Sequence, residues 1–182
     1  RLEDYQDKFI VSGNKSKKMV SLVIPVNHSR YLEQVDKILN YKNVIANFFV
    51  DYSYLISNST LIKEKSHHEF YSYGFNGEYS PDTILFSNNL ISRISNNEAI
   101  YCFSPNQSKK TLSLCNKNNL YTIAPTISGE NTPYQNIKNK LESGNIIYLS
   151  LNHTLVQELS LIIDYIEGKG YQIVGLSTLL SE

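Results

Sequence analysis

The chain has 182 residues, of which 41% are hydrophobic, so it is long enough to bury one sizeable core but not two. Its 17 basic side chains balance 17 acidic ones, which argues against nucleic acid as a partner and against a membrane surface held by charge alone. No apolar segment approaches the length of a bilayer span, so no membrane segment is expected within this chain, and any anchor or signal peptide would lie outside it.

The two cysteines, Cys102 and Cys115, are too few for a disulfide framework. They also lack the spacing of a structural zinc site. Two reduced thiols in the core are the favoured interpretation, and a single bridge between them is the alternative.

The first 18 residues are polar and carry a cluster of three lysines, Lys15, Lys17 and Lys18. We expect residues 1–18 to form a solvated N-terminal arm or linker, because a polar terminal stretch buries little. Residues 19–182 are then the folded domain.

Downstream of the arm, apolar runs alternate with stretches of helical period, which is typical of β/α units around a parallel sheet. Val20–Val26 is a nearly continuous apolar run, suited to a strand covered on both faces that ends at Pro25 or just after it. The next helix is predicted to have Ser29 as its N-cap. Its core face is predicted to hold Leu32, Val35, Ile38 and Leu39.

The remaining elements continue the alternation. Strands are expected at residues 44–50, 99–103, 120–124, 146–151 and 171–174. Helices are expected to open at Ser80–Pro81, at Ser108, and at the capping boxes Thr132–Gln135 and Thr154–Gln157, with helical ends at Gly144 and Gly168 and a last short helix at 177–180.

Three segments resemble, in order and spacing, pieces of one known family. Ala46–Val50 is similar to that family's Ala-Thr-Phe-Phe-Val strand, and His68–Gly77 matches the frame of its His-Glu-Ile-Gly-Asn-His-x-x-x-His segment. Ile162–Leu180 is similar to its closing helix, Lys-Gly-Tyr turn and Leu-Ser-Glu-Leu-Leu end. The family is the polysaccharide deacetylases of the NodB-homology kind, also called carbohydrate esterase 4-like. The resemblance covers residues 19–180 and implies an α/β fold, a distorted parallel (β/α) barrel of about six to seven units.

Members of that family typically hydrolyse an N-acetyl group on a sugar at the carboxyl ends of the strands. A divalent metal, held by an aspartate and two histidines, polarises the acetyl carbonyl and activates water. A second aspartate is the general base and a late histidine is the general acid.

The metal-binding positions of the family hold unsuitable residues in this chain. The metal-binding aspartate of the first strand falls on Val26, and the two histidines fall on Tyr73 and Gly77. Glycine offers no ligand atom and a neutral phenol is a poor one, so the resemblance predicts that the metal site is absent.

The catalytic positions are also replaced. The general base falls on Pro25, and the late Leu-His-Asp element falls on Leu149–Leu151, so that Ser150 and Leu151 stand where the family has histidine and aspartate. The family's Arg-Pro-Pro-Tyr element falls near Phe103–Asn106 and keeps only its proline at Pro105.

A displaced metal site is the alternative that the histidines allow. Three of them, His28, His68 and His153, lie near predicted strand ends, and neutral imidazoles bind zinc where they converge. No carboxylate lies beside His28 or His153, and the nearby acids are not paired with a histidine at motif spacing. The acids near predicted strand ends, Asp51, Glu69 and Glu130, are expected to be solvated or to cap helices.

A groove for a sugar is predicted at the same mouth. Its candidate residues are Asn27, His28, Tyr71, Tyr73 and His153, with Tyr52, Tyr54 and Tyr79 as further aromatic surfaces for a pyranose ring.

These replacements predict a pseudoenzyme: a deacetylase-like domain without metal-dependent activity or cofactor, serving as a glycan-binding or protein-interaction module. The alternative is an active N-deacetylase of peptidoglycan or chitooligosaccharide with zinc at a rearranged site. The resemblance implies an extracytoplasmic or cell-envelope location in a bacterium, with a cell-wall glycan or an envelope protein as the partner.

Overall fold

The computed structural model describes residues 2–181. Its strands are β1 (Met19–Val26), β2 (Asn47–Val50), β3 (Glu69–Ser72), β4 (Tyr101–Phe103), β5 (Tyr121–Ile123), β6 (Ile127–Gly129), β7 (Ile146–Leu149) and β8 (Gln172–Ile173). Its helices are η1 (Leu2–Tyr5), α1 (Leu32–Tyr41), α2 (Tyr52–Ser57), α3 (Thr60–Glu64), α4 (Ile84–Ile94), α5 (Lys109–Lys117), α6 (Pro133–Lys140), α7 (His153–Gly168) and α8 (Leu176–Leu179).

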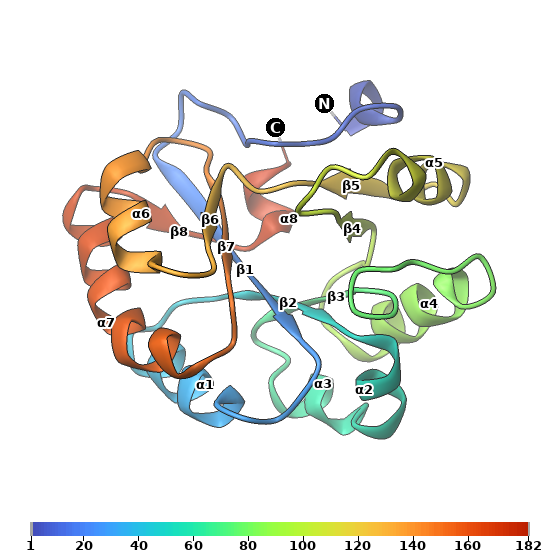
Figure 1. Cartoon of the computed structure of the whole chain (residues 1–182), viewed down its shortest axis with the longest axis horizontal. Helices are drawn as coiled ribbons and strands as arrows, with labels where there is room; N and C mark the ends of the chain where they lie inside the picture. The colour runs from blue at the N-terminus through green and yellow to red at the C-terminus, as the bar shows by residue number, and fades with distance from the viewer. Residues whose placement is uncertain (1, 182) are drawn as a thin grey trace.

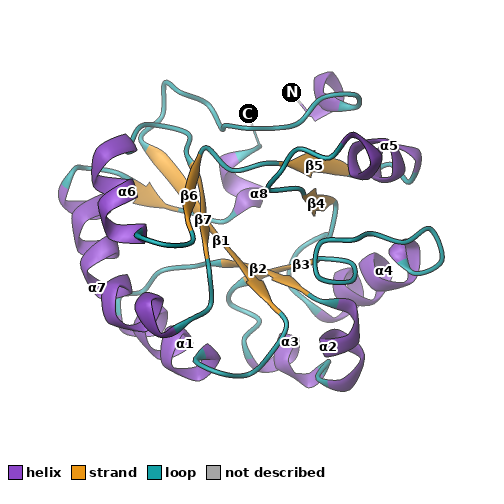
Figure 2. Cartoon of the chain, in the orientation of Figure 1, coloured by secondary structure: helices purple, strands orange, loops and turns teal. Residues whose placement is uncertain are grey.

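Every pairing between these strands is parallel, and the helices lie around the outside of the strands (Figures 1 and 2). The larger sheet has the order β3-β2-β1-β7-β6, with β8 beside the start of β1, and β4 and β5 form a second sheet. The predicted α/β architecture with parallel strands is therefore confirmed. Among the described strands no ladder joins β3 to β4 or β5 to β6, so a closed ring is not formed by strand pairing.

Strand β1 is the centre of the core. Its apolar run is buried on both faces, as the continuous pattern predicts for a central parallel strand. Two strands pair along the same edge of β1: β8 pairs with Met19 and Val20, and β2 pairs with residues 23–26. The buried amide of Asn47 fills the fork: its Nδ2 donates to the Leu22 carbonyl over 2.8 Å, and its Oδ1 accepts the Leu176 N–H over 2.8 Å.

A tyrosine bridges the two sheets where no ladder does. The hydroxyl of Tyr79, which follows β3 by seven residues, donates to the Ser72 carbonyl over 2.7 Å and accepts the Phe103 N–H over 2.9 Å. Tyr79 is therefore a buried linker of β3 and β4, and the prediction that it offers a surface for a sugar is wrong.

The expected solvated arm is not found, because Ile10 is buried in the core. This residue is 1% exposed and pairs with Ile123 of β5 through its own backbone groups. Leu2 and Tyr5 also pack against the core, and Gly13 donates to the Gly144 carbonyl over 2.8 Å. Five apolar residues in a polar stretch, three of them consecutive, gave too weak a periodicity to reveal this contact. The proposed domain boundary at residue 19 stays a prediction.

Most helices lie where the periodicity places them, but several caps differ. Ser108 caps α5 as predicted, and Asp51 caps α2 by accepting the Tyr54 N–H. Asn152, and not Thr154, caps α7, because its side chain lies one position before the first helical turn and accepts the Leu155 N–H over 2.9 Å.

Two other predicted helix starts are wrong, and a third helix starts as predicted but lacks the expected cap bond and ends early. The Ser29 hydroxyl bonds instead to the Tyr54 hydroxyl, and α1 begins at Leu32 after a left-handed Tyr31. Helix α6 begins at Pro133 with Thr132 at its N-cap position, as predicted, but the Thr132 side chain bonds to Asn136 rather than to a helical N–H, and the helix ends at Lys140, before Gly144. After Pro81 the chain makes a turn before α4 begins at Ile84.

The two cysteines form a disulfide, which corrects the favoured prediction of free thiols. Cys102 on β4 and Cys115 on α5 are both fully buried and their Cα atoms lie 6.6 Å apart, within bridging range. The apolar burial that suggested reduced thiols is compatible with either state. None of the described helices is long and apolar enough to span a bilayer.

Candidate functional site

A hollow of about 370 Å³ lies at the carboxyl ends of β1, β3 and β7. We call it the carboxyl-end hollow. Because all strands of the sheet are parallel, their carboxyl ends meet on one side, where α/β proteins place their sites. It is lined by Pro25, Asn27, His28, Tyr73, Asn76, Tyr148, Ser150 and Leu151.

Four of the six family positions identified in the sequence meet in this hollow. Pro25 of β1, Tyr73 just after β3, and Ser150 and Leu151 just after β7 line it, although these segments are far apart in the chain. Val26 does not, since its side chain alternates to the other face of β1 and is fully buried. Whether these positions form a functional site stays a prediction.

Gly77 is the remaining family position, and its backbone disfavours any other residue. Its φ of +98° lies in a region that side-chain-bearing residues rarely adopt, and a Cβ atom there would lie 3.2 Å from the Tyr73 hydroxyl. A histidine ligand at residue 77 is therefore incompatible with the present loop.

Two phenols, Tyr73 and Tyr148, line the hollow, and the Glu130 carboxylate, which is not a lining residue, bonds to one of them. The Tyr148 hydroxyl donates to Oε2 of Glu130 over 3.3 Å. Burial, together with the charge of Glu130, raises the pKa of Tyr148 to about 12, and burial raises the pKa of Tyr73 as well. Both phenols are therefore neutral hydrogen-bonding groups at neutral pH.

The loops around the hollow are held by a buried carboxylate. Oδ1 of Asp51 accepts the Asn76 N–H over 2.8 Å, while its Oδ2 caps α2. Asn27 then donates to the Asn76 side chain over 3.1 Å, which ties the end of β1 to the loop after β3. Asp51 is thus occupied as a cap, as its position in the sequence predicts, and is not free to bind a ligand.

The displaced set of metal ligands does not assemble. His28 lines the carboxyl-end hollow, and His153 is exposed with its ring 5.9 Å from that of Tyr31. His68 is 1% exposed and lies at the amino end of β3, whereas the hollow lies at the carboxyl ends of the strands. The sequence could not separate these histidines, because all three lie near strand ends and only the strand direction tells the two sides apart.

Within residues 2–181, one group of three histidine or acidic side chains has ligand atoms within 4.8 Å of one another: Asp36, His67 and His68. Its bonding does not fit a divalent metal. Nδ1 of His68 accepts the Ala46 N–H over 3.1 Å, so its Nε2 carries the proton and donates to Oδ1 of Asp36 over 2.9 Å. No ring nitrogen of His68 is left for a metal.

The charges around this group lead to the same conclusion. The Lys65 ammonium lies 3.3 Å from Oδ2 of Asp36 and 2.9 Å from Glu33, so the carboxylate already has a cation beside it. Burial lowers the pKa of His68 to about 4, which keeps the ring neutral. We interpret Asp36, His68 and Lys65 as a structural network that ties α1 to the segment before β3.

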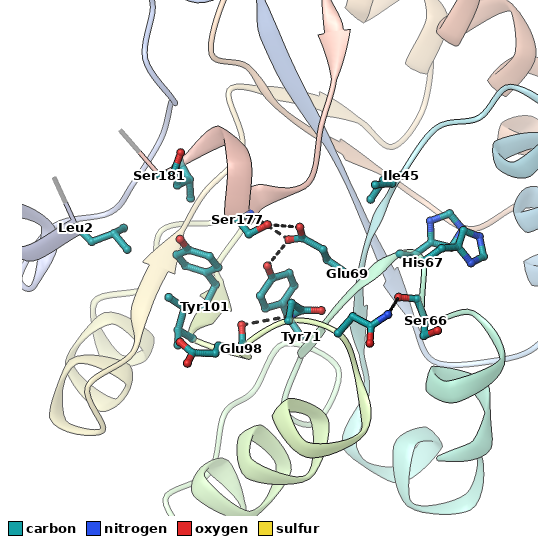
Figure 3. Close-up of a pocket in the computed structure, with 15 residues that line it drawn as sticks. Leu2, Ile45, Ser66, His67, Glu69, Tyr71, Glu98, Tyr101, Ser177 and Ser181 are labelled. Atoms are coloured by element: carbon teal, nitrogen blue, oxygen red, sulfur yellow. Dashed lines mark hydrogen bonds between the residues drawn. The ribbon is translucent and has the colours of Figure 1, made fainter.

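Tyr71 also lies away from the carboxyl-end hollow, contrary to its prediction as a groove residue. Its ring stacks on Phe49, 5.0 Å between centroids, and it lines a second pocket at the amino ends of the strands (Figure 3). Tyr52 and Tyr54 do not line the hollow either: the Tyr52 ring contacts Phe75, and the Tyr54 hydroxyl contacts Ser29. Tyr148 and Asn76 are lining residues that sequence reasoning missed. The strand alternation that puts Tyr148 on the same face as Ser150 was the available signal.

Parallel β/α units with a lined hollow at the carboxyl ends of the strands define the class of fold. No protein-family model matches the chain, and no curated protein matches it. Solved structures do. A wild-type pseudoenzyme of carbohydrate esterase family 4 from Bacillus anthracis superposes with a TM-score of 0.85 at 20% identity, over 97% of this chain and 70% of that one.

Structures described as an esterase and as a deacetylase share the same fold. A family 4 carbohydrate esterase, PdaA of Bacillus subtilis, has a TM-score of 0.78 at 18% identity over 98% of this chain and 86% of its own. A peptidoglycan N-acetylglucosamine deacetylase has a TM-score of 0.82 at 15% identity, over 98% and 94%. The fold of this chain is therefore that of the NodB-like family 4 carbohydrate esterases, as the sequence resemblance implies. The same fold occurs in proteins described as an esterase or a deacetylase and in one described as a pseudoenzyme.

Proposed function

We propose that this domain is a non-catalytic member of the deacetylase fold that binds a glycan of the bacterial cell envelope in the carboxyl-end hollow. The observation that carries the proposal is the composition of the lining. Among the described residues, its lining side chains offer amides, hydroxyls, phenols and one imidazole, and none of them is a carboxylate or a thiolate. This set fits hydrogen bonding to neutral sugar hydroxyl and N-acetyl groups, and it does not fit a catalytic divalent metal.

The loss of chemistry follows from the same residues. The family's general base position is Pro25 and its acid position is Ser150, and neither side chain transfers protons at neutral pH. Enzymes lower activation barriers by about 8 kcal/mol or more, and the metal and base supply much of that in a hydrolase of this kind. The alternative of an active N-deacetylase needs His28, His68 and His153 to converge, and they do not.

The precedent among the structural neighbours supports a retained fold without activity. The Bacillus anthracis neighbour is described as a pseudoenzyme, and a mutant of it as having restored enzymatic activity. By analogy, this chain would also keep its scaffold while the residues at the mouth change.

The buried disulfide supports an extracytoplasmic location, because such bonds persist mainly in oxidising compartments. A cell-wall glycan would be present there. An envelope protein is the other partner that the module would meet.

The test is titration with N-acetylglucosamine oligomers, with binding measured by calorimetry and by backbone NMR. We expect binding that perturbs residues of the hollow and that weakens about fivefold in Tyr148→Phe and in Ser150→Ala, since each variant removes one hydroxyl. Asn139→Ala, an exposed change on α6, is the matched control and should bind as the wild type does.

Absence of binding to oligomers and to soluble peptidoglycan fragments would overturn the glycan-binding proposal. Turnover of an N-acetylated oligomer at about 1 per second, a common enzymatic rate, would overturn the non-catalytic part of it. Zinc or cobalt titration of untagged protein provides the second measurement, and stoichiometric binding at the hollow would contradict the proposed loss of the metal site.

A further inference from the structure

Lysines collect at the amino ends of three neighbouring strands. Residues 11–19, 137–145 and 165–175 lead into β1, β7 and β8, and both β7 and β8 pair with β1. We call the lysines of these three segments the lysine rim: Lys15, Lys17, Lys18, Lys138, Lys140 and Lys169. The same segments contain two acids, Glu142 and Glu167, so this part of the chain is positive although the whole chain has no net charge.

Hydrogen bonds hold the three segments side by side. Gly144 donates its N–H to the Met19 carbonyl over 2.8 Å, and Gln172 donates to the Lys18 carbonyl over 2.9 Å. The Lys18 ammonium donates to the carbonyl of Lys169 over 3.0 Å. Figure 1 shows α6, α7 and the start of β1 on the same side of the molecule. The lysines are therefore neighbours in space, although they come from opposite ends of the chain.

Three of the lysines lie over tyrosine rings. The distances from Nζ to the ring centroid are 4.7 Å for Lys18 and Tyr171, 4.9 Å for Lys138 and Tyr134, and 5.6 Å for Lys169 and Tyr165. The rings of Tyr134 and Tyr165 meet edge to face, 6.1 Å between centroids. Because a ring face attracts an ammonium group, each pair restricts where its positive charge lies. A continuous run of contacts thus leads from Lys138 on α6 to Tyr171 before β8.

The three ammonium groups have no acidic partner. Within residues 2–181, no ion pair includes Lys18, Lys138 or Lys169. The groups that they contact are ring faces and one carbonyl, which are neutral. Glu142 and Glu167 are exposed and form no ion pair with any described residue. The positive charge of the rim is therefore available to an anion from solution.

The kind of positive group favours phosphate as that anion. The three segments contain lysine and no arginine. An ammonium group binds phosphate as a point charge, whereas the planar fork of arginine is the group that matches a carboxylate in two parallel bonds. Charges distributed over three segments suit a chain of phosphates better than a single one.

The surroundings of the lysines argue against a nucleic acid and against a membrane. Tyr134, Tyr165 and Tyr171 are half-buried and each has an ammonium over its ring, so no open ring face is offered for a base to stack on. Val11 is the one large apolar side chain of the three segments that is among the exposed ones. A surface that inserts into a bilayer needs a larger apolar face than this.

We propose that the lysine rim binds a linear phosphodiester polymer of sugars or polyols, with its phosphates at the ammonium groups of Lys138, Lys169 and Lys18. Such a polymer has a negative charge in every repeat and neither bases nor acyl chains. The other three lysines of the rim add attraction at longer range. The rim lies at the amino ends of the strands, so the proposal does not depend on glycan binding in the carboxyl-end hollow.

The experiment is calorimetric titration of the intact chain with poly(glycerol phosphate), and neutral dextran is the uncharged comparison. We expect saturable binding of the polymer in about 50 mM NaCl and affinity about tenfold weaker in about 200 mM NaCl, because each bound phosphate releases counterions. Dextran should not bind at the rim.

Two sets of substitutions separate the rim from the overall charge. The rim variant combines Lys18→Gln, Lys138→Gln and Lys169→Gln, and its affinity for poly(glycerol phosphate) should fall at least about tenfold. The control variant combines Lys63→Gln, Lys109→Gln and Lys110→Gln, which removes the same charge from exposed lysines of α3 and α5. It should bind the polymer nearly as the wild type does. Melting temperatures show whether each variant is folded.

A third variant, with arginine at the three substituted positions of the rim, keeps the charges and should retain binding. Loss of binding in that variant would contradict the proposal, as would equal affinity in the rim and control variants or no saturable binding at the lower salt concentration. Tighter binding of oligothymidylate, or of phosphatidylglycerol vesicles, would replace the proposed polymer by a nucleic acid or a membrane. The rim variant should still bind N-acetylglucosamine oligomers as the wild type does, so failure of glycan binding would leave these results unaffected.

Discussion

The hydroxyl of Tyr79 accepts the backbone N–H of Phe103 over 2.9 Å, and it stands where a closed barrel would have a strand ladder. The same oxygen donates to the Ser72 carbonyl, so one phenol connects β3 to β4. The connection between the two sheets thus depends on a side chain rather than on backbone pairing.

Tyr79→Phe should lower the free energy of unfolding by about 2 kcal/mol. The change leaves a buried N–H and a buried carbonyl without their partner, and such orphaned groups are costly. Urea unfolding measures the loss. Tyr41→Phe, at a tyrosine that is 87% exposed, is the control and should leave the midpoint unchanged. A Tyr79→Phe midpoint equal to that of the wild type would mean that water replaces the hydroxyl.

His68 should make the stability of the fold depend on pH. The pKa of the native ring, about 4, lies below its ordinary value of 6.5, so between these values the unfolded chain takes up a proton that the native chain does not. Stability is therefore complete above pH 6.5 and falls as the pH decreases towards 4, by about 2 kcal/mol between pH 7 and pH 5.

The measurement is chemical unfolding at a series of pH values. His68→Asn should be less stable at pH 7 and should lose most of the slope between pH 7 and pH 5, since its side chain does not titrate. His153→Gln, which changes an exposed histidine, should keep the slope. A slope retained in His68→Asn would assign the titration to another group.

The disulfide between Cys102 and Cys115 should stabilise the fold by about 3 kcal/mol, because it closes a short loop and restricts the unfolded chain. Unfolding in urea with and without a reductant measures this contribution. The double variant Cys102→Ala, Cys115→Ala should be at least as destabilised as the reduced wild type and should not respond to the reductant. An identical midpoint for oxidised and reduced protein would show that the bond does not form in solution.

Aspartate substitutions at two adjacent positions of the first strand should lower the free energy of unfolding by different amounts. Pro25→Asp places the new side chain in the carboxyl-end hollow, where water and polar groups surround it, and we expect a loss of less than about 1 kcal/mol. Val26→Asp places it in the fully buried face of β1, and we expect a loss of more than about 3 kcal/mol. Thermal unfolding of the two variants compares the two losses of stability. If the side chains at the end of β1 faced the opposite way, Pro25→Asp would be the more destabilised variant.

The sequence predicts the long buried strands and the amphipathic helices because their periodicity is continuous. The run before Val26 and the helix ending at Gly168 are found where expected. It does not predict α2, α3 or β6, since three to six residues are too few to show a period. The apolar stretch of β1 and the family resemblance together were sufficient to place Pro25, Tyr73 and Ser150 around one hollow.

The candidate sites were predicted less completely, because the sequence does not show at which end of a strand a residue lies. Sequence position shows that His68 lies near a strand, but not whether it lies at the strand's amino or carboxyl end. The pocket at the amino ends of the strands was missed altogether, because its lining residues come from segments far apart in the chain that only the fold brings together. Pairings of this kind have no signature in a single sequence.

The three residues of strand β4 connect the cavities at the two ends of the parallel strands. Tyr101 lines the pocket at the amino ends of the strands, while the ring of Phe103 contacts those of Tyr73 and Tyr148 in the wall of the carboxyl-end hollow. Cys102, between them, is bonded to α5. A shift of this strand would therefore change the walls of both cavities at once. A substitution on β4 should accordingly be assessed at both ends of the parallel strands.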